Sequence, residues 1–136
     1  MKAAVRYYTK TGNTRTLAEA IAEAIGVEAK PVSEPLEEYY DVLFLCNSVY
    51  AASIATDVQY FVAANKDKIG CLVNVSTAAL LKSTYSRMYE LAKALNISMS
   101  GSEFHCRGQF KFMHNGRPNE EDLEAAKKFA KDLLGL

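Results

Sequence analysis

The residues after the first apolar run have the types and spacing of an anion-binding loop. Tyr8 is followed by Thr9-Lys10-Thr11-Gly12-Asn13-Thr14, which brings together three hydroxyls, one glycine and one side-chain amide. Where such a loop opens a helix, backbone N–H groups and the positive end of the helix dipole converge on one point. The hydroxyls can donate further hydrogen bonds to phosphate oxygens. The segment therefore predicts a phosphate site, although an ordinary polar turn with Thr14 as the N-cap would use the same residues.

Other polar segments also follow predicted strands. In an open parallel sheet, ligands bind beyond the carboxyl ends of the strands, so the segments to consider are 9–14, 47–53, 76–84 and 107–116. The dinucleotide fingerprint GxGxxG is absent because Gly12 stands alone in its loop, and the Gly-Lys-Ser/Thr of a Walker A loop is absent too. The phosphate ligand is therefore of another kind.

Short apolar runs alternate with segments of helical periodicity along the chain. We expect strands at 3–8, 27–32, 42–46, 71–75 and 98–106, and helices at 14–25, 57–65, 85–95 and 120–134. The run VLFLC at 42–46 is apolar at every position, which indicates a strand covered on both faces. Asn119 and Asp122 suit a capping box at the start of the last helix. The element order, with helical crossovers and no β-hairpin, predicts a parallel sheet covered by helices on both faces, in one domain spanning 1–136.

Composition narrows the functional classes. The 136 residues carry 16 basic and 16 acidic side chains with no basic block, so we expect no nucleic-acid or membrane partner. No apolar run reaches the roughly 18 residues of a membrane span, and the first residues do not resemble a signal peptide. Three cysteines without a CxxC pair favour neither disulfides nor a zinc site, and the two histidines suggest no metal site. These features predict a cytoplasmic protein.

The loop at 8–14 resembles the T/S-x-T-G-N-T phosphate loop of flavodoxins, and chain length and element order match short-chain flavodoxins throughout. The resemblance implies a three-layer α/β sandwich whose five-stranded parallel sheet has the order 2-1-3-4-5. It also implies one non-covalent FMN, whose 5′-phosphate would be held by the loop at Thr9, Lys10, Thr11, Gly12, Asn13 and Thr14. In that family the loops after the third and fourth strands surround the isoalloxazine ring. They correspond here to Ser48, Val49, Tyr50 and Ala51, and to Ser76, Thr77 and Ala78.

The first functional interpretation is an FMN-binding electron carrier between a reductase and an acceptor protein. It has no catalytic residue of its own and is a monomer or a weak dimer. A second is a small FMN-dependent oxidoreductase that reduces a quinone-like acceptor, although 136 residues leave little room for additional substrate-binding segments. The cofactor would carry the redox chemistry in both. A third is a flavin-free interaction module of the same fold. Tyr50 is either the aromatic that stacks on the flavin or a surface side chain.

Several residues depart from the flavodoxin pattern. The net charge is zero where typical flavodoxins are strongly acidic, and the segment 50–53 lacks the glycine that many of them keep. Lys82 lies either near the flavin or in solvent. Arg6 lies within a predicted internal strand, so it needs a partner, which we expect to be a carboxylate reached along a helix. The segment from Phe104 to Phe110, with Cys106, is either a redox-active pocket or a strand end with a buried thiol.

Overall fold

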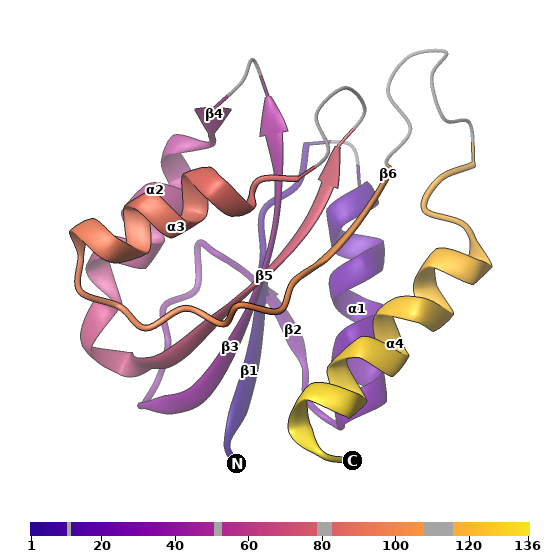
Figure 1. The fold of residues 1–136 in the computed structure, drawn as a ribbon, viewed down its shortest axis with the longest axis horizontal. Coiled ribbons are helices and arrows are strands. Elements are labelled where there is room, and N and C mark those ends of the chain that lie inside the picture. Colours follow the sequence, from indigo (N-terminus) through magenta and orange to yellow (C-terminus); the bar gives the residue numbers. More distant parts are fainter. Residues whose placement is uncertain (11, 51–52, 79–82, 108–115) are drawn as a thin grey trace.

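In the computed structural model the chain is described for residues 1–10, 12–50, 53–78, 83–107 and 116–136. Strands and helices alternate along it (Figure 1). The elements are β1 (Ala3–Tyr7), α1 (Asn13–Ile25), β2 (Ala29–Pro31), β3 (Tyr40–Tyr50), β4 (Ser53–Ile54), α2 (Thr56–Ala64), the 3₁₀ turn η1 (Lys66–Lys68), β5 (Ile69–Ala78), α3 (Tyr85–Ala94), β6 (Phe104–Arg107) and α4 (Glu120–Leu134). None of the described helices is both long and apolar enough to cross a membrane.

Five strands form a parallel sheet in the order β2-β1-β3-β5-β6. Counted among the parallel strands alone, this is the order 2-1-3-4-5, so the predicted fold class is confirmed. The expectation that the chain contains no hairpin is wrong. The two-residue β4 runs antiparallel to the end of β3, with Val49 opposite Ile54. The chain folds back there because Ile54 is buried and packs in the core before α2 begins.

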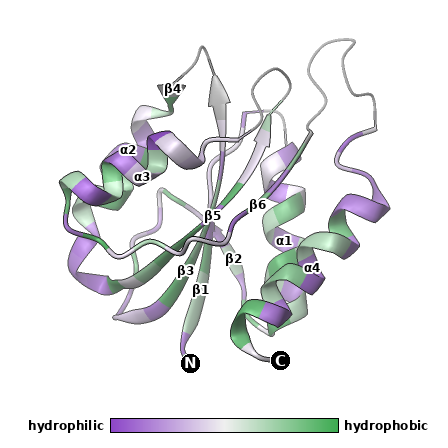
Figure 2. Ribbon diagram, in the orientation of Figure 1, coloured by the Kyte–Doolittle hydropathy of each residue, from purple (hydrophilic) through white to green (hydrophobic). Residues whose placement is uncertain are grey.

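Helices α1 and α4 cover one face of the sheet, and α2 and α3 cover the other (Figure 1). Alternate residues of a strand point to opposite faces, and β3 supplies both cores in this way. Leu43 and Leu45 pack toward α2 and α3, while Phe44 and Cys46 pack toward α1 and α4. Figure 2 shows the apolar strands enclosed between helices whose outer faces are hydrophilic. The continuous apolar run in β3 is therefore explained by burial on both faces.

Element ends differ from the predictions where local hydrogen bonds intervene. The predicted strand 27–32 shortens to β2 because Val27 N–H still bonds to the carbonyl of Ala22, closing the end of α1 beyond Gly26. The predicted strand 98–106 shortens to β6. Before β6, the described part of this segment pairs with β5 through one isolated β-bridge, between Leu72 and Met99. The chain then turns at Ser100, whose hydroxyl accepts a hydrogen bond from Ser102 N–H. Helix α4 has the predicted bounds.

Arg6 is 2% exposed in β1 and points to the α2–α3 side of the sheet. Its guanidinium donates to the carbonyls of Val5, Glu34 and Pro35. It also pairs with the Glu37 carboxylate at 2.7 Å. The predicted carboxylate partner exists, but it lies in the connection between β2 and β3 rather than along a helix. Arg6 therefore fastens that connection to the sheet.

Candidate functional site

The carboxyl ends of β1, β3, β5 and β6 lie at one edge of the sheet, where α1 also begins (Figure 1). The predicted site residues gather there. The described ones are Thr9, Lys10, Gly12, Asn13 and Thr14 after β1, Ser48, Val49 and Tyr50 in β3, and Ser76, Thr77 and Ala78 in β5. Thr11 and Ala51 lie outside the described residues, as does the side chain of Tyr50. The stacking role of Tyr50 therefore stays a prediction.

Gly12 is the residue that turns the chain from β1 into α1. Its φ of +93° lies in the left-handed region that favours glycine, and a Cβ added there would meet no atom within 4 Å. Gly12 N–H donates to Thr9 Oγ1 over 2.8 Å, and the N–H and hydroxyl of Thr16 donate to the Gly12 carbonyl. Gly12 is the N-cap, so the interpretation of Thr14 as N-cap is wrong.

The two helices of this face begin in opposite ways. Helix α4 starts with a complete capping box between Asn119 and Asp122 and with three acidic residues in its first turn. Those carboxylates complement the positive end of the α4 dipole. The first turn of α1 contains no acidic residue, and its glycine cap offers no side-chain acceptor. The positive end of the α1 dipole is thus not complemented by a carboxylate in its own first turn, and anions bind at helix ends of this kind.

Two hydroxyls meet beside the start of α1, and a third lies on the neighbouring strand. Thr14 Oγ1 lies 3.0 Å from Thr77 Oγ1, and Thr77 is in register with Ser48 on the neighbouring strand. Ser48 is 6% exposed, and its hydroxyl has no hydrogen-bond partner among the described residues. Leaving a buried polar group unpaired costs about 1–3 kcal/mol, so such groups call for an explanation. A ligand with acceptor oxygens at this edge would supply the missing partner.

A buried network on the α2–α3 side of the same edge was not predicted. Asn47 Nδ2 donates to Asn74 Oδ1 over 2.9 Å, and Asn74 Nδ2 donates to Thr84 Oγ1 over 3.0 Å. Thr84 N–H reaches Ser76 Oγ at 3.4 Å. We call Asn47, Asn74, Ser76 and Thr84 the amide network, and all four are fully buried. The signal in the sequence was an asparagine directly after the apolar run of β3 and another within the apolar run of β5.

Cys106, on β6, is buried and packs in the α1–α4 core. Burial, together with the Asp122 charge and against the opposing charge of Arg117, raises the pKa of its thiol to about 12. A thiol with such a pKa is a poor nucleophile near neutral pH. The described geometry therefore favours the interpretation of Cys106 as a buried apolar filler. Among the described residues, no group of His, Cys, Asp and Glu side chains could hold a metal ion.

The chain is similar to solved flavodoxin structures over nearly its whole length. A flavodoxin from the domain Archaea has a TM-score of 0.77 at 15% identity, covering 99% of this chain and 97% of its own. Oxidised flavodoxin 1 from Bacillus cereus has a TM-score of 0.71 at 17% identity, covering 99% and 98%. The Flv1 flavodiiron core from Synechocystis sp. PCC6803 has a TM-score of 0.77 at 14% identity, covering 98% of this chain and 35% of its own.

No family model and no curated protein matches the chain. At these sequence identities the structural likeness establishes the fold, which is flavodoxin-like.

Proposed function

We propose that this chain binds one FMN non-covalently at the carboxyl edge of its sheet and carries electrons between a reductase and an acceptor protein. The observation that carries the proposal is the buried, unpartnered Ser48 hydroxyl beside the start of α1. The flavodoxin neighbours support the same function because they share the fold over nearly the full chain. The cytoplasmic location expected from the sequence belongs to this proposal.

The residues present fit the phosphate group of FMN. The backbone of Gly12 is open to approach, no carboxylate lies in the first turn of α1, and Ser48 can donate its hydroxyl proton to a phosphate oxygen. Hydrogen bonds to an ionised acceptor are stronger than neutral ones. The loop at 9–14 would bind the phosphate, and Ser48 would add a donor from the next strand.

The segments that end β3 and β5 would hold the ring system. Ser76, Thr77 and Ala78 are buried at the end of β5, where they form a fixed wall. Thr77 is held by Thr14, and Ser76 accepts from Thr84 N–H. When bound, FMN supplies the capacity to accept and release electrons, and the chain supplies its position and surroundings.

A ligand comparison tests the phosphate site. FMN added to the protein should lose its fluorescence, whereas riboflavin, which lacks the phosphate, should bind at least about a hundredfold more weakly. Equal affinity for the two ligands, or no quenching of FMN after refolding in excess cofactor, would contradict the proposal.

The substitution Ser48→Ala gives a more specific test, because the proposal predicts that it lowers FMN affinity and raises the stability of the FMN-free protein. FMN affinity should fall about tenfold while riboflavin affinity is unchanged. The FMN-free protein should become more stable by up to about 1 kcal/mol, since an unsatisfied buried hydroxyl is removed. Ser98→Ala, at an exposed serine outside the site, is the matched control.

Electron transport is then separated from substrate reduction by kinetics. A carrier should be reduced slowly by NAD(P)H alone and rapidly when a flavodoxin reductase is added. Steady NAD(P)H oxidation in the presence of a quinone and no added reductase would favour the oxidoreductase instead. Size-exclusion chromatography with light scattering tests the expected monomer or weak dimer.

A further inference from the structure

The amide network joins the two chain segments that flank the proposed flavin site. Asn47 directly precedes Ser48, and Ser76 begins the segment at the end of β5. Thr84 stands where α3 begins, and its carbonyl accepts the first helical hydrogen bond, from Met88 N–H. The network therefore fixes the carboxyl end of β3 relative to that of β5 and to the start of α3.

Asn47 is the residue that spans the gap between the strands. Besides the bond to Asn74, its Nδ2 lies within hydrogen-bond distance of the Leu45 carbonyl, 3.0 Å away, and the Val75 carbonyl, 3.2 Å away. An amide bonded to two strands resists changes in their separation. The Nδ2 contacts of Asn47 therefore tie the end of β3 to β5.

A second buried asparagine shows what a structural amide looks like in this chain. Asn65, 5% exposed, uses both ends of its amide: Oδ1 accepts from Leu36 N–H, and Nδ2 donates to the Phe61 carbonyl. The Oδ1 of Asn47 is equally inaccessible to solvent but has no partner among the described residues. Folding has left that acceptor open, which costs stability.

We infer that Asn47 is a positioning residue of the cofactor site, because its amide holds the end of β3 against β5 and Thr84. The inference rests on the proposed FMN site and adds to it a residue outside both flavin segments. Asn47 acts through the backbone positions of Ser48 and Ser76. Without its amide the two segments lose their fixed spacing, and the site must be ordered at the expense of binding energy.

The variant Asn47→Ala and its control Asn65→Ala test the inference in the complete chain. Each removes one buried asparagine amide, so each should lower the free energy of unfolding. In folded protein, Asn47→Ala should weaken FMN binding about tenfold and alter the visible circular dichroism of the bound flavin. Asn65→Ala should change FMN affinity less than about twofold, because its contacts lie away from the site. Equal losses of affinity in both variants would overturn the inference.

A double variant, Asn47→Leu with Asn74→Leu, keeps the inference testable if Asn47→Ala does not fold. Replacing both hydrogen-bonding partners by apolar groups of similar size can leave stability nearly unchanged. This variant should fold and still show the loss of FMN affinity. Wild-type affinity in a folded double variant would show that the network does not position the site.

Hydrogen exchange on the FMN-free chain separates this inference from the proposed function. The Thr84 amide should exchange faster in Asn47→Ala than in Asn65→Ala, whether or not FMN binds. If the wild-type chain binds no FMN, the proposed function fails, and Asn47 positions no flavin. If FMN binds but Thr84 exchange is the same in both variants, the positioning role alone is wrong.

Discussion

Gly12 and Gly26 allow backbone strain to be separated from ligand binding at single residues. Both have a positive φ, and a Cβ added at either would meet no atom within 4 Å. Gly12 begins α1 at the site edge, whereas Gly26 ends the same helix. We expect Gly12→Ala and Gly26→Ala each to cost about 1 kcal/mol of stability, because alanine is strained at positive φ.

Only Gly12→Ala should also weaken FMN binding, since its methyl group would occupy open space through which the phosphate would approach the Gly12 backbone. Chemical denaturation and FMN titration of the two variants measure both effects. Loss of FMN affinity in Gly26→Ala as well would mean that helix stability, and not access to the Gly12 backbone, controls binding.

The three thiols should differ in reactivity because they differ in burial. Burial raises the pKa of both Cys46 and Cys106, and both side chains are almost inaccessible. Cys71 is partly exposed, and its pKa is also raised by burial, with a backbone hydrogen bond from Ser100 acting against the shift. We expect a thiol reagent at mildly alkaline pH to modify Cys71 alone in the native protein and all three thiols in denaturant. Labelling of Cys106 in the native protein would contradict its interpretation as a buried apolar filler and would favour a redox role for its segment.

Sequence reasoning at this scale worked where a residue acts through its own neighbours. The turn from β1 into α1 and the cap at Asn119 are local, and the sequence pattern predicted both, whereas the phosphate-binding role of the loop at 9–14 stays a prediction. The Thr14–Thr77 contact, by contrast, joins residues 63 positions apart, and Asn47 meets Asn74 only because the strands are in register. Such contacts follow from the sheet order and not from the local pattern.

At the scale of the elements, the connection between β2 and β3 depends on a charge buried inside the sheet. Glu37 is half-exposed, and burial raises its pKa, but the hydrogen bond and charge of Arg6 prevail and hold it below the ordinary value of 4.5. A carboxylate with a lowered folded-state pKa contributes stability above its unfolded pKa and loses it as the pH falls through the folded value. The ion pair therefore stabilises the protein at neutral pH and fails in acid.

The substitution Glu37→Gln should lower stability at neutral pH by about 1–2 kcal/mol, less than the loss of a fully buried pair. The difference from wild type should begin to shrink as the pH falls below the ordinary carboxyl pKa of 4.5 and should vanish only below the lowered folded-state pKa of Glu37. Urea denaturation across the pH range measures this. Glu38→Gln breaks an exposed pair with Lys2, in which both side chains are 54% exposed, and should change little at any pH.

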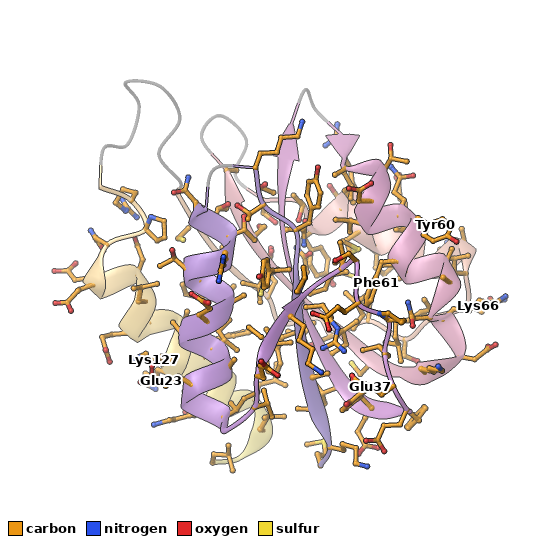
Figure 3. The ribbon with its side chains drawn as sticks, turned by 180° about the vertical axis from the view of Figure 1, so that it is seen from behind. Glu23, Glu37, Tyr60, Phe61, Lys66 and Lys127 are labelled. Carbon is orange, nitrogen blue, oxygen red and sulfur yellow. The ribbon has the colours of Figure 1, made fainter. Side chains whose placement is uncertain are left out.

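Element type was more predictable than element length. Helix α4 has the predicted ends because a capping box and a terminal glycine define them. Strands β2 and β6 are shorter than the predicted strands at 27–32 and 98–106, since the turns at Gly26 and Ser100 divert the chain first. The hairpin between β3 and β4 has no turn signature in its sequence and could not be anticipated. The Lys127–Glu23 ion pair between α4 and α1, at 3.7 Å, likewise depends on packing (Figure 3).

At the scale of the whole molecule, the balance of charge bears on the proposed redox function. The formal net charge is zero, whereas typical flavodoxins are strongly acidic. Reduction adds negative charge to a bound flavin, and an acidic protein opposes that change. We therefore expect the second electron to enter this protein at a less negative potential than in acidic flavodoxins, as measured by redox titration.

Charge reversal provides the control for that measurement. Lys66 in η1 (Figure 3) and Lys128 in α4 are exposed and lie outside the proposed site. The double variant Lys66→Glu with Lys128→Glu makes the surface more acidic. The double variant should have a more negative potential than wild type, and added salt should reduce the difference. If the potential changes neither with the charge reversal nor with added salt, contacts at the flavin set the potential.

The shortness of β2 also governs how the sheet meets other molecules of the same protein. Val32 N–H bonds to the Tyr7 carbonyl on β1. Because successive backbone nitrogens of a strand point to opposite sides, the nitrogen of Pro31 points away from β1, toward the open edge of the sheet. That nitrogen carries no proton. Within β2, the backbone N–H of Ala29 is the other group that points outward. A strand added from another molecule would therefore meet a single amide donor at this border. Filament growth by strand addition therefore finds almost no template at the β2 border.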